Sequence, residues 1–113
     1  MQRVKKLVVT VGSILCLLSL PALSESRIVS TDAAVTQILF ALGMDDALAG
    51  VDVTSALPAG YRELPVVGYH RALPAEGLLA LNPTLVIGSE HVGPPKVLAT
   101  LASAGIPVMQ LPS

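Results

Sequence analysis

The side chains of this sequence that could do chemistry are few. Tyr69, His70 and Arg71 are consecutive, Glu76 follows them, and His91 lies further along the chain. Their phenol, imidazole, guanidinium and carboxylate groups suit the binding of a metal centre or a charged ligand. Ser30, Asp32 and the two histidines reproduce no hydrolase spacing, and the sequence has neither a Gly-x-Ser-x-Gly elbow nor a Gly-rich phosphate loop. No nucleophile–base pair is evident in the sequence, so an enzyme is not the favoured prediction.

Each of these residues also has an ordinary structural interpretation. Tyr69 could be a loop tyrosine whose ring packs against the domain, and Arg71 a solvated loop charge. Glu76 is expected at the start of a short helix, where the helix dipole favours a carboxylate. His91 would lie on the rim of the domain. Residue type alone favours the structural interpretation of Tyr69.

Composition excludes several classes of protein. The chain has 113 residues, with seven Lys+Arg and eight Asp+Glu, so it lacks the basic surface that binds nucleic acid. It is 52% hydrophobic and 13% charged, which argues against disorder. Its one cysteine excludes an intramolecular disulfide and a cysteine-ligated zinc site.

Residues 1–24 read as a secretory signal peptide. Three basic side chains lie within the first six residues, an apolar run covers residues 7–20, and Pro21-Ala22-Leu23-Ser24 follows. We expect cleavage after Ser24. The apolar run is shorter than the roughly 20 residues of a membrane-spanning helix, so no stable membrane insertion is expected afterwards. Cys16 lies inside the apolar run, where lipidation is not expected. Residues 25–113 then form an acidic chain with four basic and eight acidic side chains and no cysteine.

The rest of the chain alternates strand and helix patterns. Strands are expected at 27–29, 48–52, 84–87 and 108–111, and helices within 33–42, over 75–81 and after 93–95. In the first helix, Ser30, Thr31 and Asp32 offer N-caps, and Val35, Ile38, Leu39 and Leu42 form an apolar stripe ended by Gly43. A Pro- and Gly-rich loop is expected over 53–73. The order predicts an α/β fold, a parallel sheet flanked by helices with right-handed crossovers.

Open α/β sheets bind ligands beyond the carboxyl ends of their strands. Here those ends lead into Ser30, Val53, Ser89 and Pro112. Asp52 is expected to close its strand and cap the next turn, and Asp45-Asp46 to form a solvated turn. Because the last strand has no covering helix after it, we expect an incomplete lobe, either the N-terminal part of a longer protein or a truncated reading frame.

Several stretches resemble the N-terminal lobe of bacterial periplasmic substrate-binding proteins of ABC transporters, whose two lobes are joined by one long helix. They are Arg27-Ile28-Val29-Ser30, Ala49-Gly50-Val51-Asp52, Leu64-Pro65-Val66-Val67-Gly68-Tyr69 and the run from Glu76 to Ile87. The resemblance covers residues 25–113. It implies a periplasmic protein that catalyses no reaction, delivers its cargo to an inner-membrane ABC permease, and lacks its C-terminal lobe in this chain.

Within that class, Val67-Gly68-Tyr69-His70-Arg71 is similar to the heme-binding branch. The resemblance implies that Tyr69 is the axial ligand of heme iron and that Arg71 lies beside its phenolate or meets a heme propionate. Ferric iron is a hard Lewis acid that prefers an anionic oxygen, and iron and a guanidinium both favour the phenolate. A second axial ligand would come from the missing lobe.

The resemblance gives the remaining residues lesser roles. Glu76 matches the position of an acidic residue that docks against permease arginines. Apart from the resemblance, His70 and His91 are possible cleft contacts, since imidazole can ligate heme iron and His91 follows a strand end. Neighbouring side chains diverge in an extended loop, so His70 and Tyr69 should not both reach one face of the iron. The alternatives are the same fold carrying a ferric siderophore or a corrinoid, a small secreted enzyme, and an inactive truncated remnant.

Overall fold

The computed structural model describes residues 25–112, so the predicted signal peptide lies outside the described residues. The elements, in chain order, are β1 (Ile28–Ser30), α2 (Ala33–Ala41), the short 3-10 helix η1 (Asp45–Ala47), β2 (Leu48–Val51), α3 (Ala75–Ala80), β3 (Leu85–Ser89), α4 (Pro95–Ser103) and β4 (Val108–Leu111). The described strands form one parallel sheet in the order β2-β1-β3-β4. The predicted α/β fold is confirmed.

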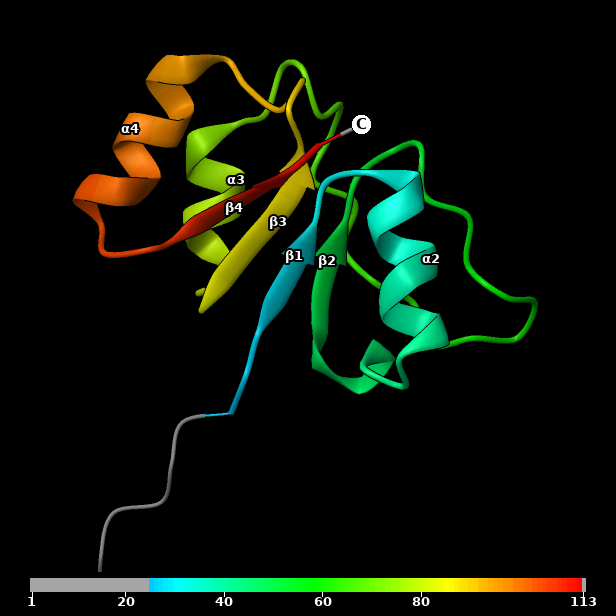
Figure 1. Ribbon diagram of the computed structural model, residues 1–113. Helices are drawn as coiled ribbons and strands as arrows, with labels where there is room; N and C mark the ends of the chain where they lie inside the picture. Colours follow the sequence, from blue (N-terminus) through cyan, green and yellow to red (C-terminus); the bar gives the residue numbers. More distant parts are fainter. Residues whose placement is uncertain (1–24, 113) are drawn as a thin grey trace, which may run out of the picture.

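Helices cover both faces of the sheet, α2 on one side and α3 with α4 on the other (Figure 1). Successive strand residues point to opposite faces. Ile28 and Ile87 therefore join Leu39 of α2 in one apolar core. Val29 and Val86 join the core that holds Leu78 of α3 and Leu101 of α4. Strands buried on both faces account for the continuous apolar runs in the sequence.

Helix α2 begins and ends as its sequence predicts, but it buries a different face. The Asp32 carboxylate accepts a hydrogen bond from the backbone N–H of Ala34 at 2.7 Å, and Gly43 follows the helix with a φ of 69°. Val35 and Leu39 are buried, whereas Ile38 and Leu42 of the predicted stripe are exposed. The reason is that Thr36 is buried in their place, since its hydroxyl bonds to residues at the end of the sheet.

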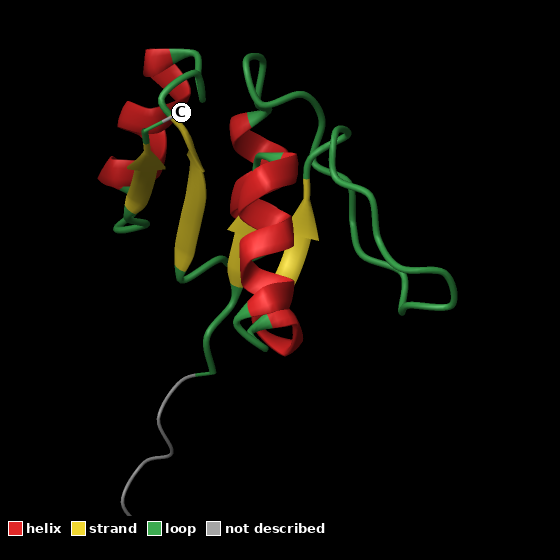
Figure 2. Cartoon of the chain, turned by 45° about the vertical axis from the view of Figure 1, so that its right-hand side comes forward, coloured by secondary structure: helices red, strands yellow, loops and turns green. Residues whose placement is uncertain are grey.

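The segment between β2 and α3 runs beside the sheet without forming a helix or a long strand (Figure 2). Val66 pairs in parallel with Val51 at the end of β2, and the N–H of Val67 donates to the carbonyl of Val51 at 2.8 Å. Just beyond, the N–H of Val53 donates to the carbonyl of Gly68 at 2.9 Å. These bonds hold residues 66–68, which directly precede Tyr69, against the end of β2.

Within residues 25–112, no helix is long and apolar enough to cross a membrane.

Candidate ligand-binding site

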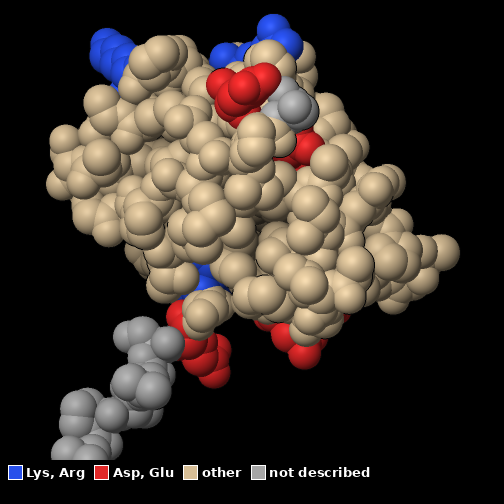
Figure 3. All heavy atoms as spheres, viewed as in Figure 1, with Lys and Arg blue, Asp and Glu red and all other residues tan. Residues whose placement is uncertain are grey.

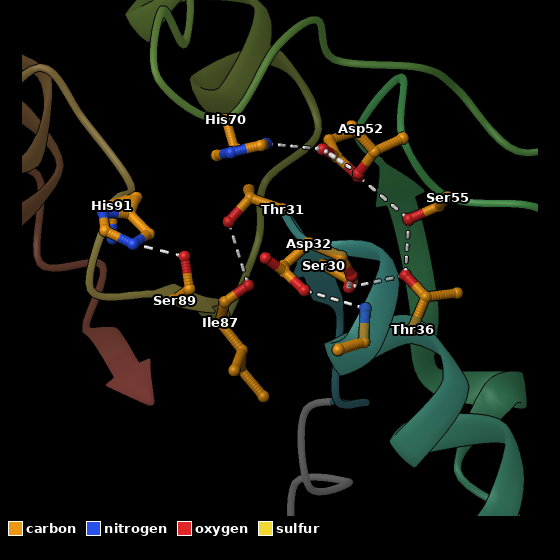
Figure 4. Close-up of polar contacts among 12 residues, drawn as sticks. Ser30, Thr31, Asp32, Thr36, Asp52, Ser55, His70, Ile87, Ser89 and His91 are labelled. Atoms are coloured by element: carbon orange, nitrogen blue, oxygen red, sulfur yellow. Dashed lines mark hydrogen bonds and ion pairs between the residues drawn. The ribbon is translucent and has the colours of Figure 1, made fainter. Parts of the chain in front are cut away.

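The parallel register brings the carboxyl ends of the strands to one edge of the sheet. Ser30 at the end of β1 aligns with Val51 of β2 and Ile87 of β3, and Ser89 aligns with Leu111 of β4. Figure 4 shows polar side chains from these strand ends and from the following loops gathered there. The predicted ligand edge is therefore the most polar buried part of the described sheet.

Asp52, the residue after β2, is the buried acid at this edge. Its side chain is 0% exposed. Oδ2 accepts a hydrogen bond from the Thr54 hydroxyl at 2.8 Å, and Oδ1 accepts one from the Ser55 hydroxyl at 2.9 Å. The backbone N–H of Ser55 also donates to the Asp52 carbonyl. The prediction that Asp52 caps the turn after its strand is confirmed.

A chain of hydroxyl groups continues from Asp52 into the body of the domain. Ser55 Oγ lies 2.7 Å from Thr36 Oγ1 of α2, which in turn lies 2.7 Å from Ser30 Oγ of β1. No buried side-chain nitrogen or oxygen of the described residues lacks a hydrogen-bond partner. Because burying a polar group is costly unless it is paired, this network holds strand, helix and loop in one arrangement.

Tyr69 lies on a tight turn that is fastened to two neighbouring segments. Gly68 precedes it with a φ of 106°, a conformation that disfavours any residue with a Cβ. The N–H of Ala72 donates to the Tyr69 carbonyl at 2.9 Å and closes the turn. His70 and Gly93 are joined by a backbone hydrogen bond of 2.9 Å. Tyr69 is 44% exposed, and no described residue hydrogen-bonds its hydroxyl.

His70 lies beside Tyr69 and does not diverge from it. The ring centroids are 4.4 Å apart and the ring planes are tilted by 55°. The expectation of diverging side chains was wrong because His70 and Arg71 occupy the central positions of a turn rather than extended backbone. His70 Nδ1 lies 3.2 Å from Asp52 Oδ2, and the histidine side chain is only 15% exposed.

Arg71 and Glu76 both face solvent. Arg71 is exposed on the turn and makes no hydrogen bond or ion pair with residues 25–112. Glu76 is exposed in the first turn of α3, where Pro74 supplies no side-chain cap. The first-turn placement of Glu76 agrees with the structural interpretation from the sequence, and both side chains are accessible to a partner.

His91 lies at the same edge, on the loop after β3 (Figure 4). Its backbone N–H donates to Ser89 Oγ at 3.2 Å, and its Nε2 lies 3.7 Å from a Glu90 carboxylate oxygen. Its side chain is half exposed. His91 is thus a rim residue, as predicted. The described residues contain no group of three or more His, Cys, Asp or Glu that could hold a metal ion by themselves.

Between α2 and the ends of β3 and β4 there is a hollow of about 250 Å³, whose lining includes Asp32, Ile38, Ser89 and Leu111. The face shown in Figure 3 is largely uncharged, with acidic and basic side chains gathered near its two ends. The hollow lies at the predicted ligand edge, whereas the pairing of Asp52 with His70 was not predicted. Asp52 and His70 are 18 residues apart, and no local pattern signals such a pair.

A family model described as periplasmic binding protein matches residues 28–113. Among solved structures, the periplasmic heme-binding protein HutB of Vibrio cholerae is 52% identical with a TM-score of 0.73, covering 77% of this chain and 34% of that one. The periplasmic heme-binding protein RhuT from Roseiflexus sp. RS-1 is 47% identical with a TM-score of 0.73, covering 79% of this chain and 34% of that one. Among curated relatives, the vitamin B12-binding protein of Yersinia pestis (strain Pestoides F) is 32% identical over 95 residues, covering 84% of this chain and 34% of its own length.

The chain therefore spans about a third of the length of these relatives. The family model covers most of the chain, and its matched residues include every described strand and helix. The chain belongs to the periplasmic binding protein family.

Proposed function

We propose that this chain is the N-terminal part of a periplasmic protein that binds heme and delivers it to an inner-membrane ABC permease. The observation that carries the proposal is the likeness to the heme-binding proteins HutB and RhuT, at 52% and 47% identity. The vitamin B12-binding relative is 32% identical. Heme is the cargo, and the chain's own residues bind and orient it without changing it chemically.

Tyr69 is the proposed axial ligand of the heme iron. Its exposed side chain and its hydroxyl without a hydrogen-bond partner among residues 25–112 support this role. Val53, whose backbone bonds to Gly68, is 57% exposed beside the same loop and offers apolar surface to a porphyrin face. An anionic oxygen suits ferric iron, and the apolar Val53 side chain suits a porphyrin face.

The neighbouring side chains would assist. Arg71 is solvent-facing two residues after Tyr69, so its guanidinium can reach a heme propionate or the Tyr69 phenolate. His91 is a rim contact. Glu76 would dock against cationic side chains of the permease, an interaction that acts mainly on the association rate and its salt dependence.

Export and a second lobe complete the proposal. Residues 1–24 would direct the chain to the periplasm and be removed after Ser24. Because the relatives are about three times as long as the matched region, we propose that heme is held against a second lobe that also supplies any second iron ligand. The chain alone then gives heme one open face, and we expect it to bind hemin weakly or to aggregate.

The test is a hemin titration of the purified protein followed by absorbance. We expect a tyrosinate–ferric charge-transfer band that is lost in Tyr69→Ala and kept in Tyr61→Phe. An unchanged spectrum in Tyr69→Ala would remove Tyr69 as the ligand. A corrinoid is the second candidate because of the vitamin B12-binding relative. Cyanocobalamin binding without hemin binding would favour it.

A further inference from the structure

Tyr69 is exposed, but the neighbouring His70 side chain hydrogen-bonds to the buried Asp52 carboxylate. Asp52 is a buried carboxylate with three side-chain partners, Thr54, Ser55 and His70. The two hydroxyls suffice to cap the turn. His70 is the partner from outside that turn, and it reaches Asp52 across 18 residues of sequence.

The chain of hydrogen-bonded hydroxyl groups holds the Asp52 carboxylate in place relative to the sheet. Its side chain connects through Ser55 to Thr36 on α2 and then to Ser30 on β1. The backbone N–H of Asp52 also donates to the Ser30 carbonyl at 3.0 Å. An imidazole that bonds to this carboxylate is therefore held relative to the sheet rather than only to its own loop.

The imidazole contacts Tyr69 directly. The two ring centroids are 4.4 Å apart, and no described residue hydrogen-bonds the Tyr69 hydroxyl. His70 Nε2 has no partner among the described residues and is not a buried atom, so it reaches the surface. With Nδ1 bonded to Asp52, the His70 ring has one orientation, and it limits the directions open to the Tyr69 ring (Figure 4 shows the Asp52–His70 pair).

Building on the proposed role of Tyr69 in heme binding, we propose that Asp52 and His70 are positioning residues that pre-orient the Tyr69 phenol toward the iron. Asp52 fixes the imidazole and the imidazole restricts the tyrosine ring. A ligand that is already ordered costs less to bind, because less side-chain freedom is lost on binding. Neither Asp52 nor His70 contacts the iron in this account.

Two substitutions distinguish the effect of the His70 ring from the effect of its hydrogen bond to Asp52. His70→Asn keeps a donor near the position of Nδ1 but removes the ring, and His70→Phe keeps a ring but loses the bond to Asp52. The protein has no tryptophan and two tyrosines, so a Tyr61→Phe background leaves Tyr69 as the one tyrosine to follow by NMR. We expect one χ1 rotamer for Tyr69 in that background and rotamer averaging in both His70 variants. His91→Asn, which alters a half-exposed histidine without a buried partner, should leave the Tyr69 rotamer unchanged.

The same variants are also titrated with hemin. We expect both His70 variants to keep the tyrosinate–ferric band and to lose about two- to tenfold in hemin affinity, the cost of ordering one side chain. A Tyr69 rotamer that stays single in both variants, even with a lowered Tm, overturns the proposal and leaves His70 a structural residue. If Tyr69→Phe binds hemin with a histidine-type spectrum that His70→Asn abolishes, His70 is itself the ligand, and the proposal is also overturned.

Failure of the proposed function gives a different result. In that case Tyr69→Phe leaves hemin binding unchanged and the spectrum does not depend on His70. The rotamer measurement, made without hemin, still decides whether Asp52 and His70 position Tyr69.

Discussion

The two tyrosines of this chain occupy opposite environments. The hydroxyl of Tyr61 donates to Asp45 Oδ2 at 3.0 Å, and its ring meets Phe40 edge-on at 5.0 Å between centroids. The Arg62 guanidinium lies 5.4 Å from the same ring centroid. The Tyr69 hydroxyl has no such partner within residues 25–112, and its side chain is exposed beside His70.

The surrounding side chains, rather than the residue type, decide whether a tyrosine hydroxyl is used within the fold or is free to bind a ligand. Asp45 and Arg62 surround Tyr61 and fasten the long loop to the segment that enters β2. Tyr69 is fastened by its backbone and by the adjacent ring, which leaves its oxygen open.

The two tyrosines should differ first in their effect on hemin affinity. Tyr69→Phe should weaken hemin binding at least about tenfold, equal to 1.4 kcal/mol, because it removes the proposed iron ligand while keeping the ring. Tyr61→Phe should change the dissociation constant less than about twofold, a difference within the usual variation of such measurements. Titration of both variants by absorbance makes the comparison, and equal losses in the two variants would contradict it.

Replacing Asp52, which bonds to the neighbour of Tyr69, should lower the free energy of unfolding more than replacing Asp45, which bonds to Tyr61. Asp52→Ala leaves three side-chain donors without their buried acceptor and should lower the free energy of unfolding by about 2 kcal/mol. Asp45→Ala removes one partly buried acceptor and should cost about 1 kcal/mol. Urea denaturation measures both. A smaller loss for Asp52→Ala than for Asp45→Ala would show that the buried network does not stabilise the fold.

Removing the Tyr61 hydroxyl should cost more stability than removing the Tyr69 hydroxyl. Tyr61→Phe loses a hydrogen bond and should lower the free energy of unfolding by about 1 kcal/mol, or the Tm by roughly 4–8 °C. Tyr69→Phe loses no hydrogen bond within the described residues and should leave the Tm within about 2 °C, as expected for a surface substitution. A larger stability loss in Tyr69→Phe would reveal a structural role for its hydroxyl.

The smallest expected effect depends on pH. Burial raises the pKa of Tyr61 above its ordinary value, the hydrogen bond to Asp45 adds to the rise, and Arg62 opposes it. The folded state thus favours the neutral phenol. Its contribution to stability is complete below the unfolded-state pKa near 10 and is lost as the pH rises through the higher folded-state pKa. The stability difference between the wild type and Tyr61→Phe should therefore narrow between about pH 9 and pH 12, and a constant difference would contradict the shift.

Much of the fold was predictable because local chemistry determines it. The apolar runs around Val29 and Val86 indicate buried strands, and Asp32 and Gly43 bound helix α2 as capping rules require. The carboxyl-end location of the candidate site follows from parallel topology alone. Asp52 as a turn cap was likewise readable from its place after a strand.

The errors arose where distant segments meet. Ile38 was expected inside, but Thr36 turns inward instead because its hydroxyl hydrogen-bonds with the hydroxyls of Ser30 and Ser55. Asp45, expected in a solvated turn, belongs to η1 and is partly covered by Tyr61. His70 was expected to diverge from Tyr69, yet the turn and the distant Asp52 bring the rings together. No sequence pattern specifies these partners.

The most direct test of the account is resonance Raman spectroscopy of the hemin complex, excited in the charge-transfer band. Incorporation of ring-deuterated tyrosine should shift enhanced phenolate modes, and the shift should persist in Tyr61→Phe and vanish in Tyr69→Phe. That result is predicted if Tyr69 holds the iron. Enhanced phenolate modes that survive in Tyr69→Phe, or a complex with no phenolate modes in the wild type, would contradict the account.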